Sequence, residues 1–136
     1  MIGFQGYVSS GPTQGFRTPQ HVQNLVIRDY CQSREMTFLL SGTEYAIPGS
    51  FLILNQMVDR LDQLEGLVLY SLFQLPEDPD ARQKIYAQLC DKGKTMHFAL
   101  EALSLSDQRS IGRIEDIWSV FLMMRDMPDI KEQLGV

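Results

Sequence analysis

The chain has 136 residues, of which 44% are hydrophobic and 21% are charged, and this composition is typical of one globular domain with a real core. Its net charge of −5 repels phosphate backbones, so we expect no nucleic-acid partner. No apolar run reaches the length of a membrane span and no leader precedes the first predicted strand, so we expect a cytoplasmic protein with no membrane partner.

Cysteine and histidine usage gives no sign of a disulfide framework or a metal centre. Cys31 and Cys90 lie far apart within predicted helices, which is typical of free thiols in a reducing compartment. The two histidines lack the spacing of metal-binding motifs, and no glycine-rich phosphate-binding string occurs. We therefore predict no metal and no cofactor.

Four short apolar segments read as strands. The first contains Gly3 and Gly6, which indicate that another backbone or a ligand comes close. The third is an unbroken apolar run, typical of a strand covered on both faces in a parallel sheet. The predicted strands are residues 2–8, 37–40, 66–70 and 94–100.

A helix is predicted after each strand. Thr18-Pro19 and Asp78-Pro79 each combine a capping side chain with a proline suited to the first helical turn. Val22, Leu25 and Val26 have the spacing of a buried stripe on the first helix. The predicted helices are residues 18–34, 51–64, 78–93 and 107–127.

Strand and helix alternate four times, which predicts an α/β, three-layer sandwich with a parallel sheet and helices on both faces. We expect one domain over residues 1–127, followed by a C-terminal tail at 128–136. In such sheets, ligands bind beyond the carboxyl ends of the strands, where the strand order reverses. Polar residues after the strands are therefore the candidates for a functional site.

The candidate catalytic residues are two hydroxyls, two carboxylates and a histidine. Ser9 and Ser10 follow the first strand, where they either serve the chemistry or form a turn. Glu44 and Glu101 are candidate acid–base groups, with solvated or capping carboxylates as the alternative. His97 lies within an apolar strand and is either a base or a hydrogen-bonded core residue.

Further polar residues are expected to bind the ligand. Arg17 lies at the mouth of the first helix, whose free N–H groups suit an anion. The ligand-binding candidates are Gln5, Arg17, Tyr45, Tyr70, Ser71 and Gln74. Their hydroxyl and amide groups suit a small polar metabolite such as a sugar or sugar nucleotide.

The last helix carries more apolar residues than one sheet contact demands. They are Ile111, Ile114, Ile117, Trp118, Phe121 and Leu122. We expect a homodimer or a larger oligomer to form through residues 107–127, the alternative being that the helix simply covers the sheet.

Tyr7-Val8-Ser9-Ser10 after a strand, a glutamine-bearing helix, an apolar third strand and a later glycine, short strand and glutamate together resemble the catalytic domain of resolvase-type serine recombinases, over roughly residues 2–125. The resemblance implies a resolvase-like, four-stranded parallel sheet in the order 2-1-3-4. In those enzymes a serine after strand one attacks a DNA phosphate, helped by an arginine two residues earlier and by two arginines after strand three.

The resemblance places Ser9 at the nucleophile position and Tyr7 where the first arginine belongs. Phe73 and Pro76 stand where the later arginines belong. A phosphoryl transition state needs such positive charge. The resemblance therefore implies the fold rather than the reaction.

Other strings resemble the sporadic carbohydrate cluster proteins, which are small bacterial proteins encoded among genes for surface polysaccharide or related sugar biosynthesis. The strings are GFQGYVSS, VQNLVIRDYC, TEYAIPG, LVLYSLFQLP and MHFALE. This resemblance covers most of the chain and implies a pathway, without naming catalytic residues.

Three functions remain open. The polar edge favours a cofactor-independent enzyme acting on a sugar, a sugar nucleotide or a similar polar metabolite. The apolar last helix favours a non-catalytic oligomeric partner of enzymes in such a pathway. The third is a degenerate serine-recombinase relative, which the acidic charge disfavours.

Overall fold

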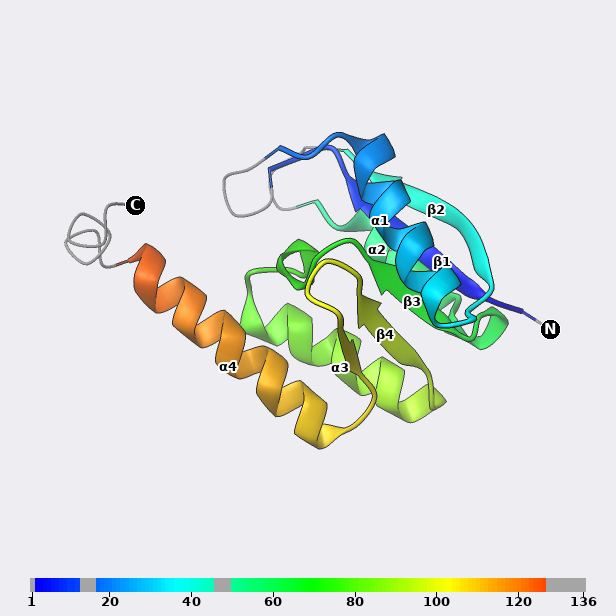
Figure 1. The fold of residues 1–136 in the computed structure, drawn as a ribbon. Coiled ribbons are helices and arrows are strands. Elements are labelled where there is room, and N and C mark those ends of the chain that lie inside the picture. Colours follow the sequence, from blue (N-terminus) through cyan, green and yellow to red (C-terminus); the bar gives the residue numbers. More distant parts are fainter. Residues whose placement is uncertain (1, 13–16, 46–49, 127–136) are drawn as a thin grey trace. The chain divides into compact units, whose positions relative to one another are not determined.

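The computed structural model describes residues 2–12, 17–45 and 50–126, so the predicted tail at 128–136 lies outside the described residues (Figure 1). By internal contacts the chain divides into two compact units, residues 1–106 and 107–136, and each is described by itself. The elements of the first unit are β1 (Phe4–Ser9), α1 (Gln20–Ser33), β2 (Phe38–Glu44), α2 (Leu52–Asp59), η1 (Leu61–Gln63), β3 (Gly66–Leu69), η2 (Leu72–Gln74), α3 (Pro79–Lys92), β4 (Thr95–Phe98) and β5 (Leu103–Leu105).

The sheet is mixed and has five strands in the order β2-β1-β3-β4-β5. The first four strands are parallel and have the expected order, but the sheet is not a four-stranded, all-parallel one. The predicted fourth strand at 94–100 is shorter in the structure, because β4 ends at Phe98 and a turn leads back into antiparallel β5, which the sequence pattern does not predict. Pairing with β5 covers the outer edge of β4 and buries Leu105 opposite Met96.

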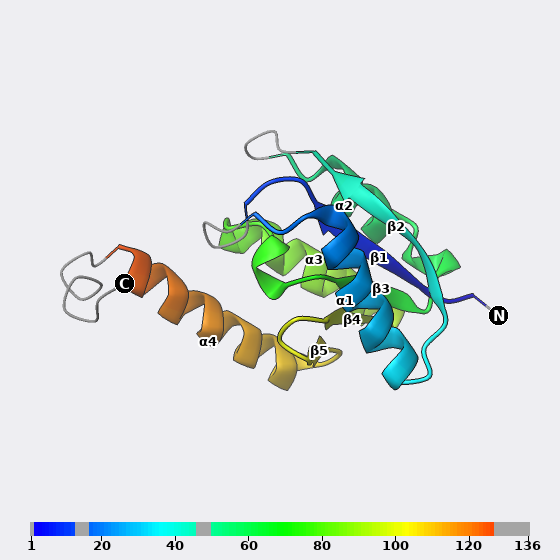
Figure 2. The same cartoon turned by 45° about the horizontal axis from the view of Figure 1, so that its top comes forward.

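Helices cover both faces of the sheet. α1 lies over one face, whereas α2 and α3 lie over the other (Figures 1 and 2). Successive side chains along a strand point to opposite faces of the sheet. Val8 and Val68 point toward α1 and join the core cluster that contains Ile27. Tyr7 and Leu67, one position away in their strands, are also fully buried and point to the opposite face.

The buried face of α1 differs from the predicted stripe. Its buried residues are Gln23, Ile27, Tyr30 and Cys31. Leu25 is 61% exposed, so the prediction that it faces the core is wrong. The helix is turned so that the Gln23 amide can reach backbone groups at the end of β1.

Gly6 lies where the pairing between β1 and β2 is irregular. The register shifts there, so that Leu40 and Ser41 of β2 face this one residue of β1. A Cβ atom on Gly6 would overlap the Ser41 Oγ and would lie 2.9 Å from the Phe38 ring. The close neighbours of Gly6 are therefore side chains of β2, whereas a backbone atom comes close at Gly3, where a Cβ would lie 2.9 Å from the Thr37 carbonyl oxygen.

The helix ends follow their local chemistry. Asp78 caps α3 by accepting a hydrogen bond from the Asp80 N–H, and Gly93 ends the helix at φ +65°, as predicted. α1 has no side-chain cap from Thr18. In the second unit, Asp107 rather than Ser106 caps α4 (Gln108–Arg125). No helix in the described part of the chain combines the length and apolar character that crossing a bilayer requires.

Candidate functional site

A buried amide connects α1 to the carboxyl end of β1. The Gln23 Nε2 donates hydrogen bonds to the carbonyl oxygens of Ser9 and Thr18, both at 2.8 Å. The Gln23 Oε1 accepts from the Ser9 N–H at 3.1 Å. The side chain is only 1% exposed, so its polar atoms depend on these partners. Gln23 thereby fixes the first turn of α1 against the end of β1.

Hydrogen bonds continue from this amide across the end of β3. The Gln74 Nε2 donates to the Gln23 Oε1 at 3.0 Å, and the Gln74 Oε1 accepts from the Ser71 N–H at 3.3 Å. The Ser71 Oγ donates to Glu101 Oε2 at 2.7 Å, and Glu101 Oε1 accepts from the Leu72 N–H at 2.9 Å. We call Ser9, Gln23, Gln74, Ser71 and Glu101 the switch-point network, because it spans the position where strand order reverses between β1 and β3.

The Ser71–Glu101 pair sits in a tight turn. The Ser71 Oγ also accepts from the Phe73 N–H at 3.2 Å, and this bond forms a capping box with Gln74 at the start of η2. Glu101 lies in the turn between β4 and β5 rather than at the end of a long strand. A hydroxyl at 2.7 Å from a carboxylate is also the spacing that general-base chemistry uses.

Glu44 is the last residue of β2 instead of a loop residue, and it is only 5% exposed. Its Oε1 accepts hydrogen bonds from the Tyr7 hydroxyl at 3.1 Å and from the Ile53 and Leu54 N–H groups at 3.1 and 3.3 Å. The N-cap residue Phe51 gives α2 no side-chain cap. Glu44 therefore supplies the negative charge and acceptors that the start of α2 needs.

Tyr7 carries the hydroxyl beneath this carboxylate. Burial raises the pKa of Tyr7 far above its ordinary value, and the charge and hydrogen bond of Glu44 raise it further. The phenol therefore stays protonated and serves as a donor to Glu44.

The two serines after β1 bond to nearby backbone. The Ser9 Oγ accepts from the Gly11 N–H at 3.3 Å. The Ser10 Oγ donates to the Glu44 carbonyl at 3.4 Å, and the Ser10 N–H donates to the same oxygen at 3.0 Å. These contacts are typical of serines that shape a turn.

His97 lies on the α1 face of β4, within the sheet rather than at its carboxyl edge. Its Nδ1 is 2.8 Å from the Tyr30 hydroxyl, and its Nε2 is 3.1 Å from the Thr95 hydroxyl. Burial lowers the pKa of His97 to about 4, and the nearby Arg34 charge lowers it as well. The imidazole is therefore neutral near pH 7, with both nitrogens bonded.

Other candidates lie outside the switch-point network. Gln5 accepts a hydrogen bond from Arg60 Nη2 at 3.2 Å, near the opposite end of β1. Tyr70 is 8% exposed and packs in the core cluster beneath α1. Tyr45 is 70% exposed, and Arg17 is an exposed residue before α1.

Sequence reasoning identifies most of the network but misses Gln23. The signal is present, because Gln23 lies one turn before Ile27 and two turns before Tyr30 on the same face of α1. A polar residue on a buried helix face must find partners. Among the described residues, no group of three histidine, cysteine or acidic side chains is arranged to hold a metal ion.

Comparisons with known proteins show similarity in fold. No protein-family model matches the sequence, and no curated protein matches it either. The crystal structure of a resolvase family site-specific recombinase from Streptococcus pneumoniae is similar with a TM-score of 0.63 and 11% identity, over 97% of this chain and 95% of that one. The N-terminal catalytic domain of TP901-1 integrase is similar with a TM-score of 0.58 and 11% identity, over 90% of this chain and 98% of that one.

These likenesses support the resolvase-like resemblance and give no support to the carbohydrate cluster family. An identity of 11% shows a shared fold and leaves the activity open. The chain therefore has the α/β fold of resolvase-type catalytic domains.

Proposed function

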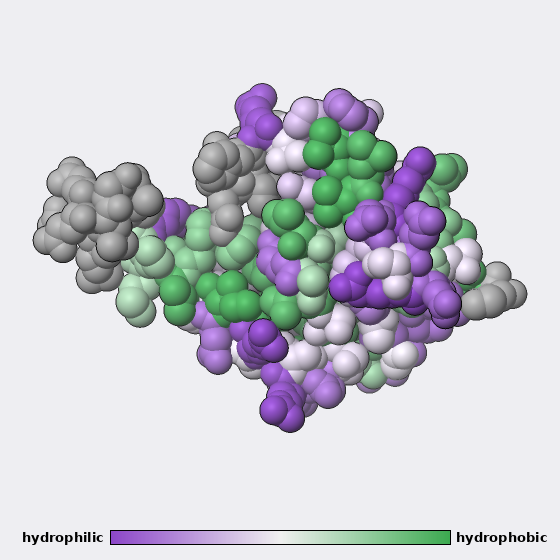
Figure 3. Space-filling view, in the orientation of Figure 1, coloured by the Kyte–Doolittle hydropathy of each residue, from purple (hydrophilic) through white to green (hydrophobic). Residues whose placement is uncertain are grey.

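We propose that this protein is a non-catalytic, resolvase-like protein that acts by assembling with a second copy of itself. The observation that carries the proposal is an exposed apolar face on α4. Val120 is 56% exposed, Met123 60% and Met124 38%. Figure 3 shows apolar side chains gathered over the C-terminal half of this helix.

The C-terminal half of α4 is apolar around most of its circumference. On one side, the rings of Trp118 and Phe121 pack edge to face with their centroids 5.8 Å apart. Ile117, Val120 and Met124 form a second stripe along the helix. The second stripe contains no charged side chain, so it suits a matching apolar surface such as its own copy about a two-fold axis. Methionine side chains adapt easily to such packing.

The polar residues of the sheet edge favour a structural use over catalysis. Glu44 and Glu101 each accept hydrogen bonds from backbone N–H groups at the start of a helical segment. Positions that the recombinase resemblance would fill with arginine hold Tyr7, Phe73 and Pro76. Phosphoryl transfer from Ser9 would lack these positive charges.

The comparisons favour a relative of the recombinase fold over an enzyme of sugar biosynthesis, for which they give no support. The net charge of −5 disfavours DNA as the partner. Self-association without catalysis is therefore the function that these observations support best.

Sedimentation of the wild-type protein and two variants tests the proposal. Wild type should be a dimer at micromolar concentration, and Val120→Glu should be a folded monomer because it places a charge in the apolar stripe. Ser119→Glu adds the same charge at an exposed position on the side of α4 that carries Glu115 and Asp116, away from the second stripe, and should remain dimeric. A monomeric wild type, or a dimeric Val120→Glu, would contradict the proposal.

Plasmid relaxation and duplex gel-shift assays at low salt test the absence of DNA chemistry. Both should show no effect, because the net charge of −5 repels phosphates and no arginine stands at Tyr7, Phe73 or Pro76 to stabilise a phosphoryl transition state. Relaxed plasmid, or duplex binding that falls steeply as salt rises, would show that this part of the proposal is wrong.

A further inference from the structure

A hollow of about 380 Å³ lies at the end of the sheet opposite the switch-point network. Its lining comes from the starts of β1 and β2 and from the segment between α2 and β3. The lining residues are Gln5, Leu39, Leu40, Arg60, Gln63 and Leu64. Its size falls within the range of sites for small ligands.

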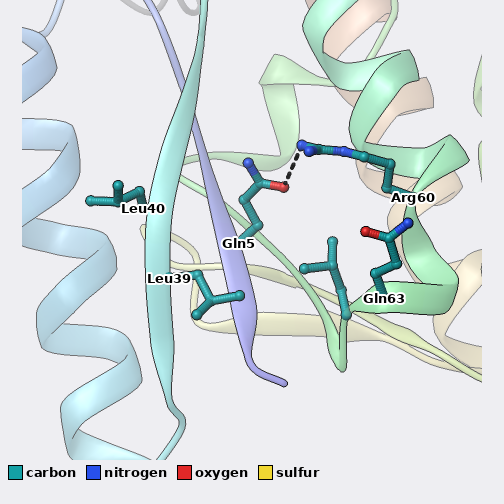
Figure 4. Close-up of a pocket in the computed structure, with 6 residues that line it drawn as sticks. Gln5, Leu39, Leu40, Arg60 and Gln63 are labelled. Carbon is teal, nitrogen blue, oxygen red and sulfur yellow. Dashed lines mark hydrogen bonds between the residues drawn. The ribbon is translucent and has the colours of Figure 1, made fainter. Parts of the chain in front are cut away.

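The hollow combines an apolar wall with a few polar groups. Leu64 is 7% exposed and Leu39 is half-buried, so both offer fixed apolar surface. Figure 4 shows Gln63 across the hollow from Gln5, and Leu40 turned away from it. An apolar wall with few, convergent polar groups is the usual make-up of a small-molecule site.

Arg60 is an exposed residue that supplies a positive charge beside the hollow. Its Nη2 donates to Gln5 Oε1 at 3.2 Å, and Figure 4 shows this side chain reaching over the hollow. Within the described ranges, Arg60 bonds to this neutral amide and to no carboxylate. One nitrogen contacts Gln5, and the remaining N–H groups of this exposed guanidinium stay available to an acceptor.

We propose that this hollow binds a small organic carboxylate with a short aliphatic chain. The carboxylate pairs with the Arg60 guanidinium, which is suited to planar, two-point contact with carboxylate oxygens. The aliphatic part of the ligand packs on Leu39 and Leu64, and the Gln63 amide offers a further polar contact. All lining residues belong to the first unit, so the proposal uses no observation on α4 and does not rest on self-association.

Titration of the full chain, followed by amide NMR shifts, tests the proposal with three probes. The probe 4-methylpentanoate should bind with millimolar affinity and shift the side-chain amides of Gln5 and Gln63. Its uncharged analogue 4-methylpentanamide tests the charge, and acetate tests the aliphatic chain. The amide should bind at least about tenfold more weakly because it lacks the charge that pairs with Arg60, and acetate should do so because it lacks the apolar part that packs on Leu39 and Leu64.

Three variants localise the site. Arg60→Gln removes the charge, and Gln5→Glu pairs Arg60 with a carboxylate of the chain itself, so both should weaken 4-methylpentanoate binding about tenfold or more. Arg113→Gln removes the same charge from an exposed position on α4 and should bind like wild type. The proposal is overturned if wild type shows no shifts at Gln5 and Gln63, if the amide analogue binds equally well, or if Arg60→Gln and Gln5→Glu bind like wild type.

Discussion

Glu44 is a buried carboxylate whose partners come from two different elements. Replacing it in Glu44→Gln removes the charge at the start of α2 and puts an amide group against the Ile53 and Leu54 N–H groups. We expect the free energy of unfolding to fall by about 1–2 kcal/mol. Urea unfolding followed by circular dichroism measures this. Asp59→Asn, an exposed change at the other end of α2, should stay within about 0.5 kcal/mol of wild type; equal stabilities would contradict the capping role.

His97 makes stability depend on pH in a defined direction. Its pKa is lowered from 6.5 to about 4 in the folded protein, so the unfolded chain binds more protons between these values. The contribution of neutral His97 to the free energy of unfolding is complete above pH 6.5 and is lost progressively as the pH falls toward 4. We expect a contribution of at most about 3 kcal/mol, since partial exposure of the ring allows solvent screening.

Unfolding of His97→Gln across this range checks the expectation. Its stability should fall less steeply with decreasing pH than that of wild type, because the titrating ring is gone. His21→Gln, at an exposed histidine, should keep the wild-type slope. An unchanged slope in His97→Gln would mean that the ring is not responsible.

At the scale of elements, the pairing of β1 with β2 depends on the missing side chain of Gly6. Gly6→Ala forces a methyl group against Ser41 and the Phe38 ring, and we expect a loss of about 1–3 kcal/mol in unfolding free energy. Gly112→Ala is a control of opposite sign, because a Cβ there would meet nothing within 4 Å apart from its chain neighbours and the backbone of its own helix, so α4 should gain about 0.5–1 kcal/mol. Thermal unfolding of both variants measures the two effects; a stable Gly6→Ala would show that β2 can shift.

The alternation of apolar strands and helices predicts the helices and the first four strands, because their periodicities are long and regular. It misses β5, since Leu103–Leu105 is only three residues and the turn before it lacks a turn-forming residue. Ala102 adopts φ +56° in this turn, a backbone conformation that an alanine in the sequence does not predict. The same alternation predicts that the second strand ends at residue 40, whereas β2 continues to Glu44. Pairing with Val8 and Ser9 keeps residues 41–44 extended although their sequence is typical of a loop.

The candidate site was predictable to the extent that it follows strand ends. Ser9, Ser71, Gln74 and Glu101 meet through one network because parallel strands finish at one edge. The orientation of side chains was not predictable in this way. Gln5 projects at the other end of its strand, and Tyr70 turns into the core.

For the whole molecule, the proposed self-association predicts that thermal stability depends on protein concentration. A folded dimer is favoured over unfolded monomers by mass action, so Tm should rise as wild-type protein is concentrated. Val120→Glu should melt at one temperature at all concentrations. Differential scanning fluorimetry over a dilution series measures this, and a constant wild-type Tm would count against a dimer.

The central place of β1 in the sheet has a consequence for the order of folding. β1 pairs with β2 on one side and with β3 on the other, and both partners come later in the chain. Each pairing closes a long loop, whereas β4 and β5 are joined by one short turn and can pair locally. We therefore expect the β4–β5 hairpin to form early when the complete chain refolds. During synthesis, by contrast, one edge of β1 stays open until β3 has left the ribosome, and the hairpin can form only after that.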